Sequence, residues 1–459
     1  MDRIKSMFNN TPQKANEEEY EPLTDDSGTI EGSMYCEDEA PFSWIEYSIF
    51  ALIGVAMLWA WNMFMAAAPY FQKRFQSDEW ILDHFQSAII SVSTVTNLVA
   101  MLILTNIQSS ANYPLRINTA LLLNAVVFVV LTLSTSYFLD VSAPTYLGFL
   151  LTMVAGTAWA AGLMQNGAFA FAASFGRPEY TQAIMAGQGI AGILPPLAQM
   201  VSYLAVPPAA EPTGQEDAGP SQEAATAAFI YFLTAVAVSG VAILAFQPLV
   251  KRHNRLIEQR MVEQLAESVT SIEEAERAAR HFVSLPTLFR KLQWTAAAVF
   301  LCFLMSMFFP VFTSKILSVR SAEKSASRIF EPGAFIPLAF FFWNLGDFVG
   351  RAATILPFSL RHRPHALFGI SLARGLFLPL YLLCNIRGQG AVVQSDFFYL
   401  VLVEFPFGLT NGWLGSSGMM AAGEWVADGE REAAGGFMGL CLVAGLTVGS
   451  LLSFTAAGI

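Results

Sequence analysis

The sequence predicts an all-α protein that crosses a lipid bilayer many times. Of the 459 residues, 54% are hydrophobic and only 13% are charged, whereas soluble domains carry about 25% charged residues. Mean hydropathy is +0.48. Eleven apolar runs are long enough to cross a bilayer, since a spanning helix needs about 20 apolar residues.

Among the connections between the eleven expected spans, the longest polar loop follows the sixth span. The spans lie near 45–71, 84–108, 116–139, 144–174, 181–206, 226–250, 292–316, 332–357, 364–385, 396–423 and 434–457. The polar loop has apolar residues at helical spacing among its charges, which predicts an amphipathic helix. We therefore expect four parts, at 1–42, 43–250, 251–291 and 292–459: a tail, a six-helix bundle, a linker and a five-helix bundle.

The N-terminal tail is acidic and polar. Residues 1–40 contain 11 Asp and Glu against 3 Lys and Arg, a composition typical of disorder. Because the tail has no apolar stretch, we expect the first span to act as the insertion signal. Residues 20–23, "YEPL", have the form of an endosomal or vacuolar sorting signal. A plasma membrane and a vacuolar or lysosomal membrane are both compatible with this sequence.

Basic residues predict the orientation. With the tail placed in the cytoplasm, 16 Lys and Arg fall on the cytoplasmic side and 7 on the other. Cytoplasmic loops of membrane proteins carry the excess of positive charge. We therefore expect a cytoplasmic N-terminus and an extracellular or luminal C-terminus, with the loop 251–291 in the cytoplasm.

The eighth expected span contains two charges in the stretch "WNLGDFVGR" at 343–351. Asp347 and Arg351 are four residues apart, so they share one helix face with Asn344. The pair leaves acceptor and donor capacity that suits a vicinal diol; the alternative is a structural clasp between helices. Gly346 and Gly350 leave room for a ligand or a neighbouring helix.

Other spans carry polar or aromatic side chains at membrane depth. Trp61 and Met65 lie one turn apart, with Asn62 adding a polar edge. A tryptophan there can stack on an aromatic ligand, but the residue taken alone favours core packing. Gln165 and Asn166 carry amides that can bind a heterocycle or another helix.

The fifth span combines small residues with prolines. Its glycines suit close helix contact, and they are Gly187, Gly189 and Gly192. Gln188 between them can hydrogen-bond a neighbouring helix. Pro195 and Pro196 should break or kink the helix.

Two further deep charges are Arg374 and Glu404, which we expect to be structural or gating elements. Glu404 can also bind a coupling proton. The sequence has no phosphate-binding loop, paired carboxylates or nucleophile with a base, so we expect neither an enzyme nor an ATP-driven pump. The scattered cysteines and histidines predict no disulfide framework and no metal site.

Five stretches together resemble the equilibrative nucleoside transporter family. They are "WNMFMAAAPYF" at 61–71, "YTQAIMAGQGIAG" at 180–192, "DFVGR" at 347–351, "LARGLFLPLYLLCNI" at 372–386 and "TNGWLGS" at 410–416. The resemblance covers about 45–459 in the same order. It implies a pseudo-symmetric six-plus-five bundle similar to the major facilitator architecture, with substrate bound between the halves.

The resemblance also implies roles for particular residues. Trp61 would flank the base, Gln165 would hydrogen-bond its edge, and Asp347 with Arg351 would hold the ribose hydroxyls. The neighbouring cavity residues would be Asn62, Met65, Asn344 and Leu446. Apart from the resemblance, we expect packing or gating roles for Gly187, Gln188, Gly189, Gly192, Arg374 and Asn411.

The function implied is facilitated transport of nucleosides such as adenosine and uridine, with no cofactor, no ATP and no nucleic-acid partner. Proton-coupled nucleoside or nucleobase transport through Glu404 is the alternative. A receptor or scaffold without transport is disfavoured by eleven spans with deep polar residues on several of them.

Overall fold

The structure is a computed structural model that describes residues 42–107, 112–137, 141–205, 222–267, 283–321, 327–356 and 360–453. The expectations for the acidic tail, for "YEPL" and for the end of the chain at Ile459 lie outside these residues, as does the linker from 268 to 282. Residues from Phe42 onward form one compact unit.

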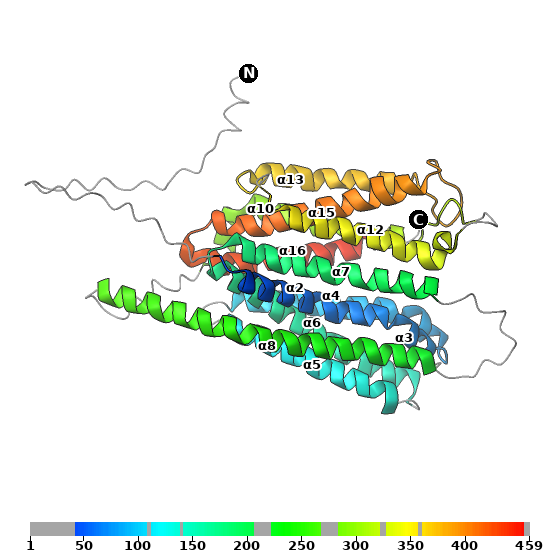
Figure 1. Ribbon diagram of the computed structural model, residues 1–459, viewed down its shortest axis with the longest axis horizontal. Helices are drawn as coiled ribbons and strands as arrows, with labels where there is room; N and C mark the ends of the chain where they lie inside the picture. The colour runs from blue at the N-terminus through cyan, green and yellow to red at the C-terminus, as the bar shows by residue number, and fades with distance from the viewer. Residues whose placement is uncertain are drawn as a thin grey trace, which may run out of the picture. The chain divides into compact units, whose positions relative to one another are not determined.

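The described part of that unit is almost entirely helical (Figure 1). The N-terminal half contains α2 (Trp44–Ala66), α3 (Ala68–Arg74), α4 (Glu79–Asn106), α5 (Tyr113–Tyr137), α6 (Ala143–Ser174), α7 (Pro178–Ala205) and α8 (Gln222–Glu267). The C-terminal half contains α10 (Leu285–Ser306), α11 (Phe309–Thr313), α12 (Pro332–Ala353), α13 (Pro364–Ala373), α14 (Phe377–Tyr381), α15 (Phe405–Ala421) and α16 (Arg431–Ser453).

Within the described residues, nine helices have the length and hydropathy needed to cross a membrane. This confirms a polytopic helical protein but not the count of eleven spans. The other two expected spans are interrupted helices: α13 and α14 are joined by a short 3-10 turn, and a π-helical segment at Phe398–Glu404 precedes α15. Each interruption lies near a proline, Pro379 in α14 and Pro406 at the start of α15, and proline removes a backbone N–H.

Two other boundaries and the effect of two prolines differ from the sequence-based expectation. The first span turns at Ala67 between α2 and α3. The sixth expected span does not end at residue 250, because α8 continues to Glu267 as a single helix of 46 residues. Pro195 and Pro196 do not break α7, which runs through them to Ala205.

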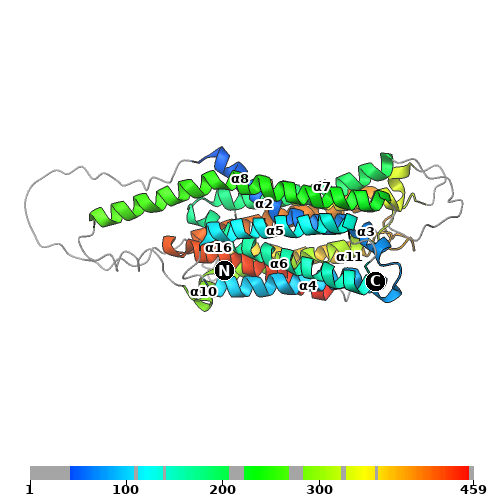
Figure 2. The same ribbon diagram turned by 90° about the horizontal axis from the view of Figure 1, so that it is seen from below.

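The helices of the two halves run side by side. Figure 1 shows the N-terminal half in blue to green and the C-terminal half in yellow-green to red, with α7 next to α12 between them. The halves also meet where α16 packs on α6 and α4. Figure 2 shows α8 extending beyond the other helices at one side of the bundle.

The apolar cores differ between the two ends of the bundle. At the end where α2 begins, one core joins both halves, and we call it the shared core; it includes Phe50, Tyr180, Phe246, Leu292 and Met438. Toward the opposite end each half has its own core. Phe64, Phe128 and Phe232 belong to the N-terminal one, and Phe312, Tyr381 and Tyr399 to the C-terminal one. Apolar packing therefore closes the bundle at the α2-start end.

Candidate functional site

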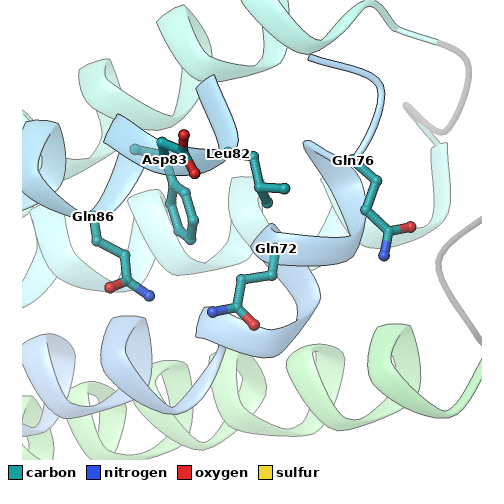
Figure 3. A pocket seen from close by; sticks show the side chains of 6 residues that line it. Gln72, Gln76, Leu82, Asp83 and Gln86 are labelled. Atoms are coloured by element: carbon teal, nitrogen blue, oxygen red, sulfur yellow. The ribbon is translucent and has the colours of Figure 1, made fainter. Parts of the chain in front are cut away.

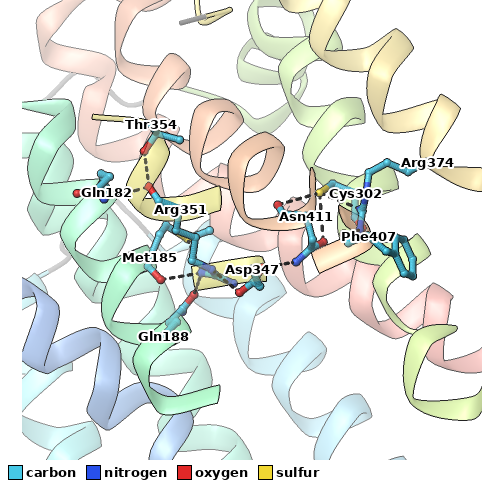
Figure 4. A network of polar contacts seen from close by, with 10 residues as sticks. All are labelled: Gln182, Met185, Gln188, Cys302, Asp347, Arg351, Thr354, Arg374, Phe407 and Asn411. Carbon is cyan, nitrogen blue, oxygen red and sulfur yellow. Dashed lines mark hydrogen bonds and ion pairs between the residues drawn. The ribbon is translucent and has the colours of Figure 1, made fainter. Parts of the chain in front are cut away.

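Helix α12 carries the two charges into the interior of the bundle. Asp347 is 4% exposed and Arg351 is 5% exposed. Arg351 Nε donates to Asp347 Oδ2 at 2.7 Å. The expected ion pair along one helix face is therefore present, and it is buried (Figure 4).

The second oxygen of Asp347 is held from another helix. Asn411 on α15 donates its Nδ2 to Asp347 Oδ1 at 2.7 Å. Both carboxylate oxygens thus have a partner, one from α12 itself and one from α15. The carboxylate cannot turn without breaking one of these two bonds.

Close packing of α12 on α15 brings these side chains together. Two glycine pairs, each with four-residue spacing, face one another: Gly346 and Gly350 on α12, Gly408 and Gly412 on α15. A Cβ at Gly412 would overlap the carbonyl oxygen of Asp347, and one at Gly346 would overlap that of Phe405. Small residues at this spacing allow helix backbones to approach closely. The room beside Gly346 and Gly350 is therefore filled by α15.

Arg351 also binds α7 across the boundary between the halves. Its Nη1 donates to Met185 O at 2.8 Å and to Gln188 Oε1 at 3.0 Å. In return, Gln182 Nε2 donates to Arg351 O at 3.1 Å. The remaining guanidinium nitrogen, Nη2, has no partner among the described residues. Arg351 is thus part of an interhelical clasp and retains donor capacity for a ligand.

The glycines of α7 face two different helices. A Cβ at Gly187 would overlap Ala51 O on α2, whereas one at Gly189 would lie 3.1 Å from Phe348 Cα on α12. Gln188 between them donates to Met57 Sδ on α2 at 2.9 Å. Helix α7 is therefore packed closely on both sides, as its composition predicts.

The two predicted asparagines approach α7 at adjacent residues. Asn62 Nδ2 donates to Ala191 O at 2.8 Å. A Cβ at Gly192 would overlap Asn344 Oδ1, so Asn344 lies directly against that glycine. Asn344 donates its own Nδ2 to Phe340 O at 2.8 Å. Asn62 and Asn344 thus meet one segment of α7 from opposite halves.

Among the described residues, no hydrogen bond or ion pair joins the other predicted ligand residues to Asp347 or Arg351. Trp61 is half-buried against the N-terminal core, and Leu446 packs on the shared core. Met65 is 45% exposed. Gln165 is buried and accepts from Asn97 Nδ2 at 3.4 Å, while its own amide nitrogen has no partner among the described residues. Their membership of one binding site stays a prediction.

Glu404 lies in a separate buried cluster of the C-terminal half. It is 0% exposed. Its Oε1 accepts from Thr313 Oγ1 at 2.6 Å, and its Oε2 accepts from Tyr381 OH at 2.9 Å. Within the described chain no ion pair involves this carboxyl group. Its hydrogen-bonding needs are met by hydroxyls rather than by a cation.

Several residues of the network were absent from the sequence prediction. Met185 acts through its backbone carbonyl, which leaves no side-chain signal. Cys302 contacts Asn411 at 3.4 Å through its thiol, and a lone cysteine in an apolar run gives no indication of that. Gly408 and Gly412 could have been found, because their spacing repeats that of Gly346 and Gly350.

A hollow of about 440 Å³ lies between α3 and the start of α4 (Figure 3). It is lined by Gln72, Gln76, Leu82, Asp83, Phe85 and Gln86. None of these residues was predicted to bind a ligand, and Asp83 is exposed and has no cationic partner in the described structure. The hollow is therefore distinct from the candidate site.

Comparison with known proteins identifies relatives over most of the chain. Residues 151–457 match the family model described as "Nucleoside transporter". The "Nucleoside transporter FUN26" of Saccharomyces cerevisiae is 27% identical over 452 residues, 89% of this chain and 83% of that protein. "Equilibrative nucleoside transporter 1" of Homo sapiens is 24% identical, over 88% of this chain and 95% of that protein.

Solved structures of transporters share the fold. A major facilitator superfamily transporter, FucP, solved in the outward conformation, gives a TM-score of 0.54 at 14% identity, over 90% of this chain and 92% of that chain. The human organic anion transporter MFSD10 (TETRAN) gives 0.53 at 14% identity, over 89% and 92%. At this identity the likeness concerns the fold alone, and it supports the expected major-facilitator-like architecture.

Proposed function

Because the chain belongs to the nucleoside transporter family, we propose that it carries nucleosides across a membrane by facilitated diffusion, with Asp347 and Arg351 holding the ribose. The observation that carries this proposal is the buried ion pair with unused hydrogen-bonding capacity. A carboxylate has about four lone-pair sites and a guanidinium five N–H donors. Only part of each set has a partner in the described structure.

A ribose diol fits the remaining capacity. Each hydroxyl of the diol can donate to a lone pair of Asp347 and accept an N–H from Arg351 Nη2. A nucleobase without its sugar makes neither contact. Hydrogen bonds to charged groups contribute about 1.5–3 kcal/mol each, so removing the ribose should weaken binding strongly.

The remaining contacts would belong to the base. We assign the free amide nitrogen of Gln165 to its edge and the ring of Trp61 to its face. Asn62, Met65, Asn344 and Leu446 complete the proposed cavity. Adenosine and uridine are the substrates that we propose to test first.

Transport then requires the halves to rock about the fixed site. The shared core closes the bundle at the α2-start end, which the excess of basic residues assigns to the cytoplasm. The structure would therefore represent a state closed toward the cytoplasm. To open that end, the protein must separate the shared core and release the bond between Gln182 and Arg351 O. A passive carrier needs no ATP for this step.

Uptake into proteoliposomes tests the assignment. We expect wild-type protein to take up radiolabelled uridine and to take up uracil poorly. Asp347→Ala should lower uridine uptake at least tenfold, because it leaves Arg351 buried without its anion. Asp83→Ala, which removes an exposed carboxylate far from the network, is the matched control. Equal uptake of uracil, or wild-type uptake by Asp347→Ala, would exclude the ribose role of Asp347.

A fluorescent fusion of the full chain distinguishes a plasma-membrane location from a vacuolar or lysosomal one. Surface labelling of that fusion tests the proposed cytoplasmic N-terminus. An epitope at the N-terminus should be protected in intact cells and become accessible after permeabilisation.

Proton-coupled transport is the second candidate, because the fully buried Glu404 carboxyl group has no cationic partner among the described residues. Coupling predicts that an inwardly directed proton gradient drives accumulation of uridine above equilibrium, and that Glu404→Gln abolishes accumulation but not exchange. Facilitated diffusion predicts equal final levels with and without the gradient. Uptake with an imposed pH difference separates the two.

A further inference from the structure

We propose that Cys302 is a positioning residue for sugar recognition: its thiol, fixed by Arg374, orients the amide of Asn411, which in turn fixes the Asp347 carboxylate. This inference rests on the proposed ribose role of Asp347. Cys302 itself would touch no substrate, since it acts through Asn411.

Arg374 supplies the fixed end of the chain of contacts. It is 1% exposed. Its Nη1 donates to Cys302 O at 2.5 Å and to Cys302 Sγ at 3.1 Å. Its Nη2 donates to Phe407 O at 3.3 Å, and the guanidinium carbon lies 4.7 Å from the centre of the Phe407 ring. These bonds to backbone carbonyls hold the guanidinium in one position.

The chemistry of each group sets the direction of the hydrogen bonds. A guanidinium only donates, so the sulfur of Cys302 must accept from Arg374. The thiol proton is then free to point at Asn411, whose Oδ1 lies 3.4 Å from Sγ and whose backbone oxygen lies 3.5 Å away. The side-chain oxygen of Asn411 therefore faces Cys302. Its amide nitrogen faces Asp347 Oδ1, at 2.7 Å.

The opposite orientation of Asn411 is unfavourable at both ends. A flipped amide would place Oδ1 against the carboxylate, two acceptors without a proton between them. It would also turn the amide N–H groups toward Cys302, so that the thiol proton loses Oδ1 as its acceptor. Figure 4 shows this chain from Arg374 through Cys302 and Asn411 to Asp347.

The consequence for the substrate follows from the carboxylate torsion. The terminal torsion of aspartate is intrinsically broad, so bonds to its oxygens must set it. Arg351 holds Oδ2 and Asn411 holds Oδ1, which directs the unused lone pairs of Asp347 along fixed lines. Loss of the thiol donor frees the amide, and the carboxylate then samples orientations that do not match the diol.

We call the hydrogen-bonded chain from Arg374 through Cys302 and Asn411 to Asp347 the relay. Substitution of the Cys302 thiol tests it. Cys302→Ser retains a group that accepts from Arg374 and donates to Asn411, whereas Cys302→Ala removes it. The readout is the ratio of apparent KM for 2′,3′-dideoxyuridine, which lacks the diol, to that for uridine. A neutral hydrogen bond contributes about 0.5–1.5 kcal/mol, so we expect Cys302→Ala to lower this ratio about 2- to 10-fold and Cys302→Ser to keep it. Cys441→Ala, at a thiol outside the relay, should also keep it.

The outcomes separate the relay from the proposed function. Suppose that Asp347→Asn shifts the KM ratio. The relay is then overturned if Cys302→Ala leaves this ratio unchanged, or if Cys302→Ala and Cys302→Ser lower it equally. An unchanged ratio in Asp347→Asn overturns the ribose assignment itself, and the relay with it. If the Ala variant does not reach the membrane, Cys302→Val retains the volume without the donor, and uridine-induced thermal stabilisation of the purified protein gives a second readout of the same ratio.

Discussion

Each member of the buried Asp347–Arg351 ion pair also forms hydrogen bonds to groups outside the pair. Asp347 accepts from Arg351 and from Asn411, and Arg351 also donates to Met185 and Gln188 on α7. Removing one partner of a buried pair typically costs 3–5 kcal/mol, because the other charge is left uncompensated. The sequence predicted the pair from its four-residue spacing. A structural clasp and a ligand site are compatible interpretations of this pair. Arg351 joins α12 to α7 and still has N–H donors available for a ligand.

Substitution of Glu404 should destabilise the protein according to the acceptors that remain. Glu404→Leu leaves the hydroxyls of Thr313 and Tyr381 buried without an acceptor, which costs about 1–3 kcal/mol for each hydroxyl. Glu404→Gln retains one acceptor oxygen and should lose less. Thermal unfolding of the purified protein should therefore rank wild type above Glu404→Gln, and Glu404→Gln above Glu404→Leu. A Leu variant as stable as wild type would contradict the hydrogen-bonding role of this carboxyl group.

At the scale of helices, glycine determines which elements pack most closely and so which side chains meet. The paired glycines of α12 and α15 bring Asp347 and Asn411 together, while those of α7 bring α2 and α12 to either side of Gln188. Glycines also allow close packing of the last helix, α16, on α10. A Cβ at Gly445 or Gly449 would overlap a backbone carbonyl oxygen of α10. Small-residue spacing is visible in the sequence, but the identity of the facing helix is not.

Adding one methyl group at this contact should separate the helices. In Gly412→Ala the new Cβ overlaps Asp347 O, which must move α12 away from α15 and lengthen the bond between Asn411 and Asp347. We expect uridine uptake to fall more than tenfold, with reduced thermal stability. Gly240→Ala is the matched control, because no atom lies within 4 Å of a Cβ there and alanine favours a helix over glycine by about 1 kcal/mol. Normal uptake by Gly412→Ala would contradict the close contact.

At the scale of the whole transmembrane unit, the two halves share an apolar core at one end only. The shared core contains Phe50 and Met438 from opposite halves, whereas Phe64 and Phe312 belong to separate cores. Large apolar surfaces stay together because water would otherwise hydrate them. The end with the shared core is therefore closed in this state, and opening it requires new contacts at the other end to compensate.

Thiol labelling should detect this asymmetry. Met65 on the second half of α2 is 45% exposed, whereas Met57 is 3% exposed. In a variant whose native cysteines are replaced by serine, which keeps the donor at Cys302, a membrane-impermeant reagent added from the side opposite the N-terminus should modify Met65→Cys rapidly and Met57→Cys slowly. Excess uridine should protect Met65→Cys if that residue borders the substrate. Equal labelling of the two positions would contradict a bundle closed at the α2-start end.

The sequence by itself determined the class of protein, the helical bundle and the most informative polar face. Apolar runs of bilayer length leave few alternatives to spanning helices, and the period of the helix places Asp347 and Arg351 on one face whatever their neighbours are. Only the tertiary packing decided three other features. Helix α15 fills the space beside Gly350, and the thiol of Cys302 and the guanidinium of Arg374 lie behind Asn411. Packing also determines which end of the bundle is closed. Such contacts depend on pairs of helices far apart in the chain, and local periodicity carries no information about which pairs meet.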